Sequence, residues 1–138
     1  MSAGSQLGAG RPTKRRPGVG VGGLPVADPR PVWDGDAVLG VRCTACRYPQ
    51  AQREIPWCPA CHEPVAPERF TPRGTIWSST VVTIPVGTRR PPFALAYLDL
   101  DDGPRVLVHL AEPRVLRAGT RARITGTDHG DLVAEEDR

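Results

Sequence analysis

The sequence predicts a mainly β protein with three parts: an unstructured tail, a small cysteine-rich module and a five-stranded barrel. Gly and Pro account for 31 of the 138 residues, well above their usual share, so the chain is expected to be rich in loops. All four cysteines lie between residues 43 and 61. Residues 71–135 hold five short segments of β-branched and apolar residues separated by turn signals, and they show no long helical pattern.

The tail comprises residues 1–30, which contain mostly Gly, Pro, Ser and Arg with few apolar residues. Such a segment cannot bury enough apolar surface to offset the entropy lost on ordering, so we predict that it is disordered. Its basic cluster, RPTKRRPG at residues 11–18, could contact a phosphate backbone or an acidic surface. A solvated tail that aids solubility is the alternative.

The second part, residues 31–70, begins with the lead-in PVWDGDAVLGV at residues 31–41. We expect this lead-in to form one helical turn or a short strand, anchored by Trp33, Val38, Leu39 and Val41. The cysteine module follows and extends to residue 70.

The third part, residues 71–138, is predicted to be the barrel. Residues 93–100 alternate imperfectly, as a strand buried on both faces would. Asp-Asp-Gly at 101–103 and His-Gly at 129–130 are turn signals. Five strands joined by short turns favour a small antiparallel barrel of the OB type. The expected strands are residues 75–84, 93–100, 105–111, 121–128 and 131–136.

The cysteines follow the pattern C-x2-C, eleven residues, C-x2-C: Cys43, Cys46, Cys58 and Cys61. Two intervening residues let a tight turn aim both sulfurs at one point, and two such knuckles supply the tetrahedral thiolate set that Zn²⁺ accepts. Rubredoxin-type iron is the main alternative, although its knuckles usually lie farther apart in sequence. With four cysteine ligands no coordination position is left for a substrate, so the predicted zinc is structural.

Two other uses of the cysteines are less favoured. Disulfides are rare in the cytosol, and a redox C-x2-C needs only one pair at a helix start. His62, directly after Cys61, could replace a cysteine as ligand, but an ordinary loop residue is the favoured interpretation. Glycine often follows the second cysteine of a knuckle because the backbone there is strained; here those positions hold Arg47 and His62.

The charge of the chain is unevenly distributed. Its formal net charge of +3 arises in the first 31 residues, which carry +4, while the remaining 107 carry −1. Four thiolates on one Zn²⁺ would bring the folded part to about −3. Nucleic-acid binding is therefore not expected, because such proteins usually carry a basic patch on the folded domain. No apolar run is long enough to span a membrane and no signal peptide is evident, so a cytoplasmic location is predicted.

We find no convincing catalytic set. Asp99, Asp101 and Asp102 are close in sequence, but they fit the polar start of a hairpin turn better than a metal or acid–base site. His109 lies in an apolar strand and is expected on the barrel surface or partly buried. His129 lies in a turn and carries little signal.

The order of these features resembles one family. A Trp-containing lead-in, a short ribbon with CPAC, the strand RGTIWSSTVV, then LAYLDLDDGPRVLVHL and LRAGTRARI follow one another. This looks like the rubredoxin-like zinc-ribbon plus OB-fold family of acyl-CoA-associated proteins, over residues 31–135. The long Gly/Pro/Arg tail and the missing knuckle glycines depart from the family pattern.

The resemblance implies a non-catalytic accessory subunit of a thiolase-superfamily enzyme, in lipid or polyketide metabolism. Members occur with acetyltransferases, ketoacyl-synthase-like enzymes, hydroxymethylglutaryl-CoA synthases and aldolases that shorten steroid side chains. They dock on the large subunit as hetero-oligomers and help shape its acyl-CoA channel, or bridge it to a neighbouring enzyme.

Binding of acyl-CoA needs cations for its phosphates. Arg89 and Arg90, on the loop before residue 93, are the candidates for contact with CoA or with the partner. A solvated loop is the alternative.

A single-stranded nucleic-acid-binding module is the second functional hypothesis, since OB folds bind single strands. Such binding needs exposed aromatic side chains. The barrel segment offers Trp77, Phe93 and Tyr97, and we expect at least some of these to lie in the core.

Overall fold

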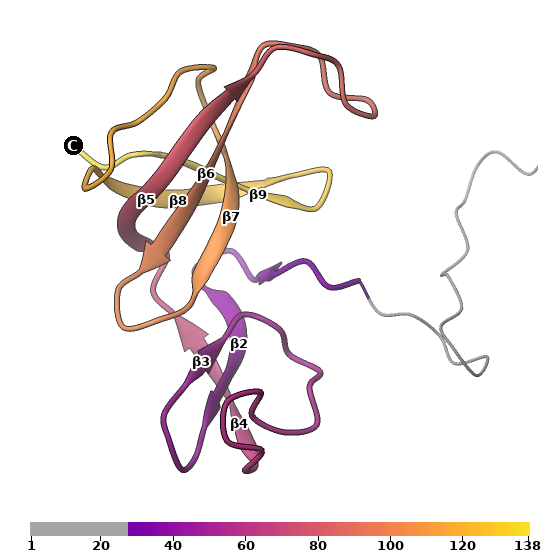
Figure 1. The fold of residues 1–138 in the computed structure, drawn as a ribbon, viewed down its shortest axis with the longest axis vertical. Helices are drawn as coiled ribbons and strands as arrows, with labels where there is room; N and C mark the ends of the chain where they lie inside the picture. The colour runs from indigo at the N-terminus through magenta and orange to yellow at the C-terminus, as the bar shows by residue number, and fades with distance from the viewer. Residues whose placement is uncertain (1–27) are drawn as a thin grey trace, which may run out of the picture.

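The computed structural model describes residues 28–138. The predicted disordered tail, residues 1–30, therefore lies outside the described residues except for its last three. The described chain contains nine strands and no helix (Figure 1). The strands are β1 Val32–Trp33, β2 Val38–Cys43, β3 Pro49–Gln50, β4 Val65–Phe70, β5 Arg73–Val82, β6 Phe93–Leu100, β7 Arg105–Leu110, β8 Arg121–Asp128 and β9 Asp131–Glu136.

Strands β1 to β4 form the small sheet of the cysteine module, which lies below the barrel in Figure 1. The central strand β2 pairs with β4 along one edge, from Val38 opposite Phe70 to Cys43 opposite Val65. Its other edge pairs with β1 and then with β3. The lead-in therefore forms short strands rather than a helical turn. The pattern in the sequence did not indicate β4, whose six residues include Pro67, Glu68 and Arg69.

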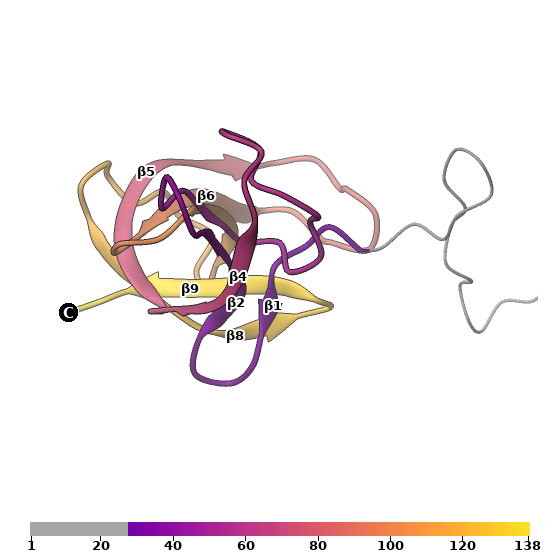
Figure 2. The same cartoon turned by 90° about the horizontal axis from the view of Figure 1, so that it is seen from below.

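Strands β5 to β9 form a closed barrel in the order β5-β6-β7-β9-β8. Figure 2 shows β5 curving round one side of this ring, while β8 and β9 lie along its lower side. Strands β5 and β8 pair where the ring closes. The predicted five-stranded OB-type barrel is confirmed, with one correction. Neighbours β7 and β9 run parallel, with His109 opposite Val133, because directions cannot alternate all the way round a ring of five strands.

The strand boundaries agree closely with the sequence pattern. Strands β6, β8 and β9 have the predicted bounds, β7 ends one residue earlier at Leu110, and β5 spans Arg73–Val82 instead of residues 75–84. The two predicted turns also form. Each places a non-glycine residue in the left-handed region, Asp102 with φ 49° and His129 with φ 52°.

One hydrophobic core serves both parts of the molecule. The cluster of buried side chains contains fifteen residues, and only Val38 and Phe70 come from the cysteine module. Phe70 is 2% exposed and lies so close to Gly103 that an added Cβ there would meet the ring at 3.1 Å. The ribbon sheet is therefore capped by the barrel and has no separate apolar core among the described residues.

Arg42 on β2 ties the ribbon to the barrel with polar contacts. Its Nε donates to the carboxylate of Glu68 on β4 at 2.9 Å, and its Nη1 donates to the carbonyl oxygen of Arg47 in the first knuckle, also at 2.9 Å. Its Nη2 donates to the carbonyl oxygen of Asp102 in the β6–β7 turn. The guanidinium also lies 5.5 Å from the centroid of the Phe70 ring. The hydrogen bond that Arg42 donates to Glu68 raises the pKa of this buried arginine, which keeps it charged.

Residues 28–30 are also held against the barrel. Arg30 donates from Nη1 to the carbonyl oxygen of His129 in the β8–β9 turn at 2.7 Å.

The described part of the chain contains no helix with the length and apolarity needed to cross a bilayer.

Candidate metal centre

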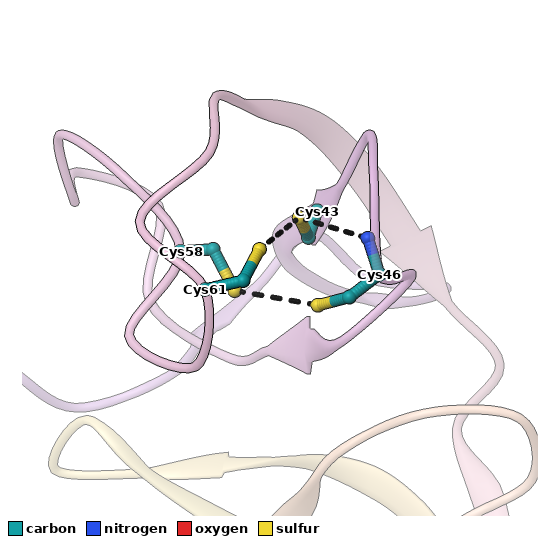
Figure 3. Close-up of side chains that lie close together, drawn as sticks. All are labelled: Cys43, Cys46, Cys58 and Cys61. Carbon is teal, nitrogen blue, oxygen red and sulfur yellow. Dashed lines mark hydrogen bonds between the residues drawn. The ribbon is translucent and has the colours of Figure 1, made fainter.

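The four predicted cysteine ligands come together in the ribbon, where Cys43 lies at the opposite end of β2 from the core residue Val38 (Figure 3). Cys43 ends β2, and the chain then turns so that the backbone N–H groups of Ala45 and Cys46 both donate to its sulfur at 3.3 Å. In the second knuckle the N–H of Ala60 donates to the sulfur of Cys58 at 3.3 Å. The knuckle backbone thus stabilises negative charge on the sulfurs, which metal binding requires.

The spacing of the sulfurs fits a metal ion. All four Sγ atoms lie within 4.8 Å of one another, with Cys43 and Cys61 at 3.5 Å and Cys46 and Cys58 at 3.7 Å. Tetrahedral coordination with Zn–S bonds of about 2.3 Å places sulfurs about 3.8 Å apart, whereas a disulfide needs about 2.0 Å. The geometry supports the four-thiolate interpretation over disulfides.

Both knuckles adopt the strained backbone without glycine. Arg47 has φ 68° and His62 has φ 66°, in the left-handed region that usually disfavours residues with a Cβ. The turns are held by backbone hydrogen bonds, from the N–H of His62 to the carbonyl of Cys58 at 2.8 Å and from the N–H of Cys43 to the carbonyl of Tyr48 at 3.0 Å. The missing glycines therefore change the local strain but leave the arrangement of the ligands intact.

The thiols differ in their surroundings. Cys43 and Cys58 are fully buried, whereas Cys46 and Cys61 are exposed. The backbone hydrogen bond from Cys46 lowers the pKa of Cys43 to about 6. For Cys61 the N–H of Glu63 acts to lower the pKa, but the neighbouring thiols, Cys43 first, raise it to about 12. A divalent cation between the sulfurs would relieve this mutual repulsion, since it binds all four as thiolates.

This donor set fits a structural Zn²⁺ ion. Soft thiolates in a tetrahedron suit zinc or iron, and four of them leave no coordination position open. His62 does not belong to the cluster of possible ligands found within residues 28–138. Its ring instead meets the edge of Trp57, with 6.5 Å between the centroids.

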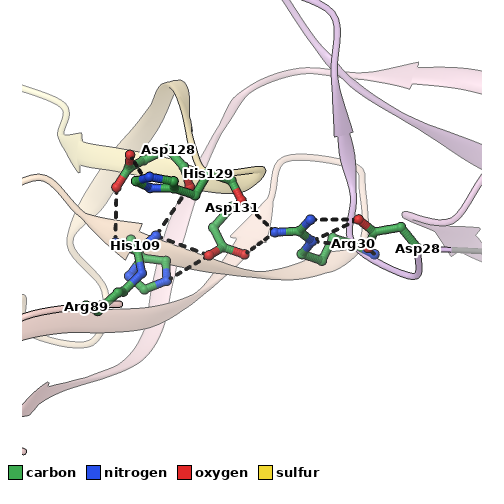
Figure 4. Close-up of polar contacts among 7 residues, drawn as sticks. All are labelled: Asp28, Arg30, Arg89, His109, Asp128, His129 and Asp131. Carbon is green, nitrogen blue, oxygen red and sulfur yellow. Dashed lines mark hydrogen bonds and ion pairs between the residues drawn. The ribbon is translucent and has the colours of Figure 1, made fainter. Parts of the chain in front are cut away.

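The structure places the two candidate arginines of the β5–β6 loop in different settings. Arg89 points back onto the barrel (Figure 4), where it pairs with Asp128 at 3.2 Å and with Asp131 at 3.1 Å. Arg90 is exposed and forms no ion pair with the described residues. Only Arg90 is therefore free, among the described contacts, to reach an external anion without breaking an ion pair.

His109 lies beside this ion-pair cluster on β7. Its side chain is 13% exposed, its Nε2 is 3.5 Å from the carboxylate of Asp131, and its ring stacks obliquely on Phe93 at 5.9 Å. Its Nδ1 is buried without a hydrogen-bond partner. Burial, reinforced by Arg89, lowers the pKa of His109. This matches the expected partly buried residue and provides no substrate-facing base.

The aspartates of the β6–β7 hairpin do not form a site of their own. Asp99 pairs with Arg105 at 2.6 Å and Asp101 with Arg121 at 2.6 Å, while Asp102 lies at the turn itself. Each carboxylate is thus associated with the hairpin and its ion pairs, as expected for a polar turn.

The positions of the aromatic side chains correct two predictions. Trp77 and Tyr97 are 52% and 45% exposed, and Phe93 is only partly buried, so none of the three belongs to the core. Strand β6 is also not buried on both faces. Its inward positions are Ala94, Ala96, Leu98 and Leu100. A five-stranded barrel is narrow, so its strands fill the interior with alanine and aliphatic side chains while these three rings stay outside the core.

Ion pairing neutralises most of the basic residues. Residues 28–138 contain fourteen arginines and fifteen carboxylates, and ten of these arginines form ion pairs within the described chain. Four of the fourteen arginines in residues 28–138 are therefore left without an ion pair, which are few cations for tracking a phosphate backbone.

The comparisons agree with this architecture. Residues 68–127 match the family model described as "ChsH2, C-terminal OB-fold domain". A solved structure titled "Ltp2-ChsH2(DUF35) aldolase" contains a chain that is similar in fold, with 20% identity, a TM-score of 0.57, and coverage of 72% of this chain and 84% of the other. No curated protein matches. The family match covers the chain from the end of β4 to β8, and together with the similar fold it supports the predicted resemblance for the OB-fold part.

Proposed function

We propose that this protein is a non-catalytic, zinc-stabilised accessory subunit that docks on a thiolase-like, acyl-CoA-processing enzyme. It helps to shape the acyl-CoA site of that enzyme or bridges it to a partner enzyme. A cytoplasmic location is part of this proposal. The observation that carries it is the four-cysteine ribbon joined through one core to a ChsH2-type barrel.

Two further features support an accessory role. The similar solved chain belongs to a structure whose title names two proteins and an aldolase. Within residues 28–138 the cysteines form one cluster suited to a closed metal site, and the hairpin aspartates are engaged in ion pairs. A chain of this kind contributes surface and rigidity rather than reacting groups.

The direct test is an affinity pull-down of the tagged, zinc-loaded protein from its native lysate at moderate salt, followed by mass spectrometry. The expected result is a thiolase-superfamily protein in near-stoichiometric amount. Recovery of no such protein, under conditions in which the bait retains its zinc, would contradict the proposal.

The loop arginines give this proposal a second test. We propose that Arg90, and Arg89 if its ion pairs open, contacts the partner or the CoA phosphates. Replacing both by Ala is expected to weaken the complex or to raise the apparent KM of the partner for its CoA substrate. Arg90→Ala alone should produce most of the effect, because Arg89 is engaged with Asp128 and Asp131. No change in either quantity would end this part of the proposal.

A single-stranded nucleic-acid-binding module remains the second candidate. The exposure of Trp77 and Tyr97 favours it, because bases stack on exposed aromatic rings and OB folds bind single strands on this side of the barrel. The ion pairing of most arginines argues against nucleic-acid binding, because paired arginines are not available to contact phosphates. Salt-dependent binding of single-stranded oligonucleotides would support this alternative.

A further inference from the structure

The outer face of β5, β6 and β7 carries a compact apolar group. Trp77, Tyr97 and Leu107 are each about half exposed, at 52%, 45% and 49%. Tyr97 lies directly opposite Leu107 in the β6–β7 register, and the rings of Trp77 and Tyr97 meet edge to face at 6.0 Å. Three neighbouring strands therefore present one continuous apolar surface to solvent.

Arg105 completes this group, which we call the tryptophan face: Trp77, Tyr97, Leu107 and Arg105. The guanidinium lies 4.0 Å from the centroid of the Trp77 ring. Asp99 accepts two hydrogen bonds from it, from Nε at 2.6 Å and from Nη2 at 3.2 Å. Arg105 is thus held in one position, and its charge is balanced within the face.

A β-bulge helps to present Trp77. The β5–β6 register shifts between Ile76 and Ser78, so Trp77 is an additional residue in its strand. Ile76 points into the barrel with 1% exposure, and Trp77 and Ser78 both lie exposed. Bulges of this kind redirect side chains and are frequent next to functional sites.

We propose that the tryptophan face is the surface through which this chain anchors its thiolase-like partner. This inference rests on the proposed function and specifies the docking surface. Trp, Tyr and Arg are the residue types that dominate the binding energy of protein interfaces. The partner surface that fits them is apolar and without excess charge, because the one cation of the face is already neutralised by Asp99.

The same charge balance argues against a nucleic acid on this face. Affinity for a phosphate backbone comes from cations that replace its counterions. Arg105 would have to break both hydrogen bonds to Asp99 and leave the Trp77 ring to supply such a contact. A protein surface covers Trp77, Tyr97 and Leu107 without separating this pair.

The test measures the dissociation constant for the thiolase-superfamily protein that the wild-type pull-down identifies. The variants are Trp77→Ala and Tyr97→Ala, with Trp57→Ala as the matched control. Trp57 is equally exposed at 55% but lies in the ribbon. Arg105→Ala is matched by Arg121→Ala, which removes an ion pair of similar exposure elsewhere on the barrel. Zinc content and melting temperature verify that every variant is folded.

We expect Trp77→Ala and Tyr97→Ala to weaken binding about 30-fold or more, the effect of an interface hot spot, and both controls to change it less than about 3-fold. Wild-type affinity in folded Trp77→Ala and Tyr97→Ala would overturn the inference while leaving the accessory role intact. Equal losses from Trp57→Ala would also overturn it. Absence of any thiolase-superfamily partner would reject both proposals. Oligonucleotide binding, or self-association of the wild type, that is lost in Trp77→Ala would assign the face to another ligand.

Discussion

The ribbon and the barrel are both small β structures, yet they are stabilised in different ways. The barrel supplies thirteen of the fifteen residues of the hydrophobic core, and its sheet closes on itself. The ribbon supplies two core residues and ends in a loop region that is organised by its four cysteines, by backbone hydrogen bonds and by polar side chains such as Arg42. One part is held by buried apolar area, the other by its attachment to the first and by the four-cysteine cluster, which fits a metal ion.

This difference in stabilisation suggests that the barrel and the ribbon have different structural roles. A barrel with its own core can present a preorganised outer face. A ribbon whose four cysteines bind a metal ion needs little core of its own, since ligand bonds replace apolar burial. Arg42 and Phe70 lie where the two meet, so the relative position of the parts depends on few residues. The following predictions are ordered from the largest expected effect to the smallest.

Removal of the metal should have the largest effect, and it should act on the ribbon and not on the barrel. We expect Cys43→Ser, or chelation of the wild type, to unfold residues 43–64 while the barrel stays folded. The metal-binding free energy at stake is on the order of 10 kcal/mol. Amide NMR signals of the ribbon should collapse and those of β5 to β9 should remain dispersed. A ribbon that stays protected from hydrogen exchange without metal would contradict this interpretation.

Arg42→Met should loosen the junction and lower the free energy of unfolding by about 2–3 kcal/mol, because it leaves Glu68 and two carbonyl groups without their donor. Partial exposure of Glu68 moderates the loss. Arg69→Met is the matched control: its pair with Asp34 is just as short, at 2.8 Å, but 60% of the arginine side chain is exposed. We expect it to cost less than about 0.5 kcal/mol in urea unfolding. Equal effects would show that burial at the junction is unimportant.

His109→Phe should stabilise the barrel by about 1 kcal/mol near pH 6, because it removes a buried nitrogen that has no partner. The sign of the pH effect follows from the lowered pKa. The unfolded chain takes up the proton first as the pH falls below about 6.5, so the native protein loses stability there. Urea unfolding at about pH 7.5 and about pH 6 should show a smaller pH difference in the variant than in the wild type. An unchanged difference would mean that other groups cause it.

The knuckle residues should give the smallest effects. Arg47→Gly and His62→Gly relieve the left-handed backbone of the ribbon, and each is expected to stabilise it by about 0.5 kcal/mol, since the gain is partly offset by the flexibility of glycine in the unfolded chain. This stabilisation is measurable as slower loss of zinc to a competing chelator. Arg53→Gly, in the loop between the knuckles, is the control and should not slow zinc loss. If the knuckle variants lost zinc faster, their side chains would contribute more than strain.

Local patterns in the sequence account for much of the architecture. The turn at 101–103 separates β6 from β7, and the turn at 129–130 separates β8 from β9. Both were predictable because turn-forming residues are flanked there by alternating apolar residues. The C-x2-C spacing specifies the ligand cluster because two intervening residues force both sulfurs of a knuckle to one side. By contrast, β4 lacked a pattern of its own. Its place is decided by β2, whose residues Val38 to Cys43 it pairs with across the whole strand.

What the sequence determined by itself is therefore what neighbouring residues decide: the knuckles, the hairpins and the number of barrel strands. Only the tertiary structure decided which side of each strand meets the core. The narrow barrel takes Ala94 and Ala96 inside and turns Tyr97 outward, and the β5 bulge exposes Trp77. It also decided that Arg89 is engaged and Arg90 is exposed, because the acids that bind Arg89 come from a turn about forty residues away.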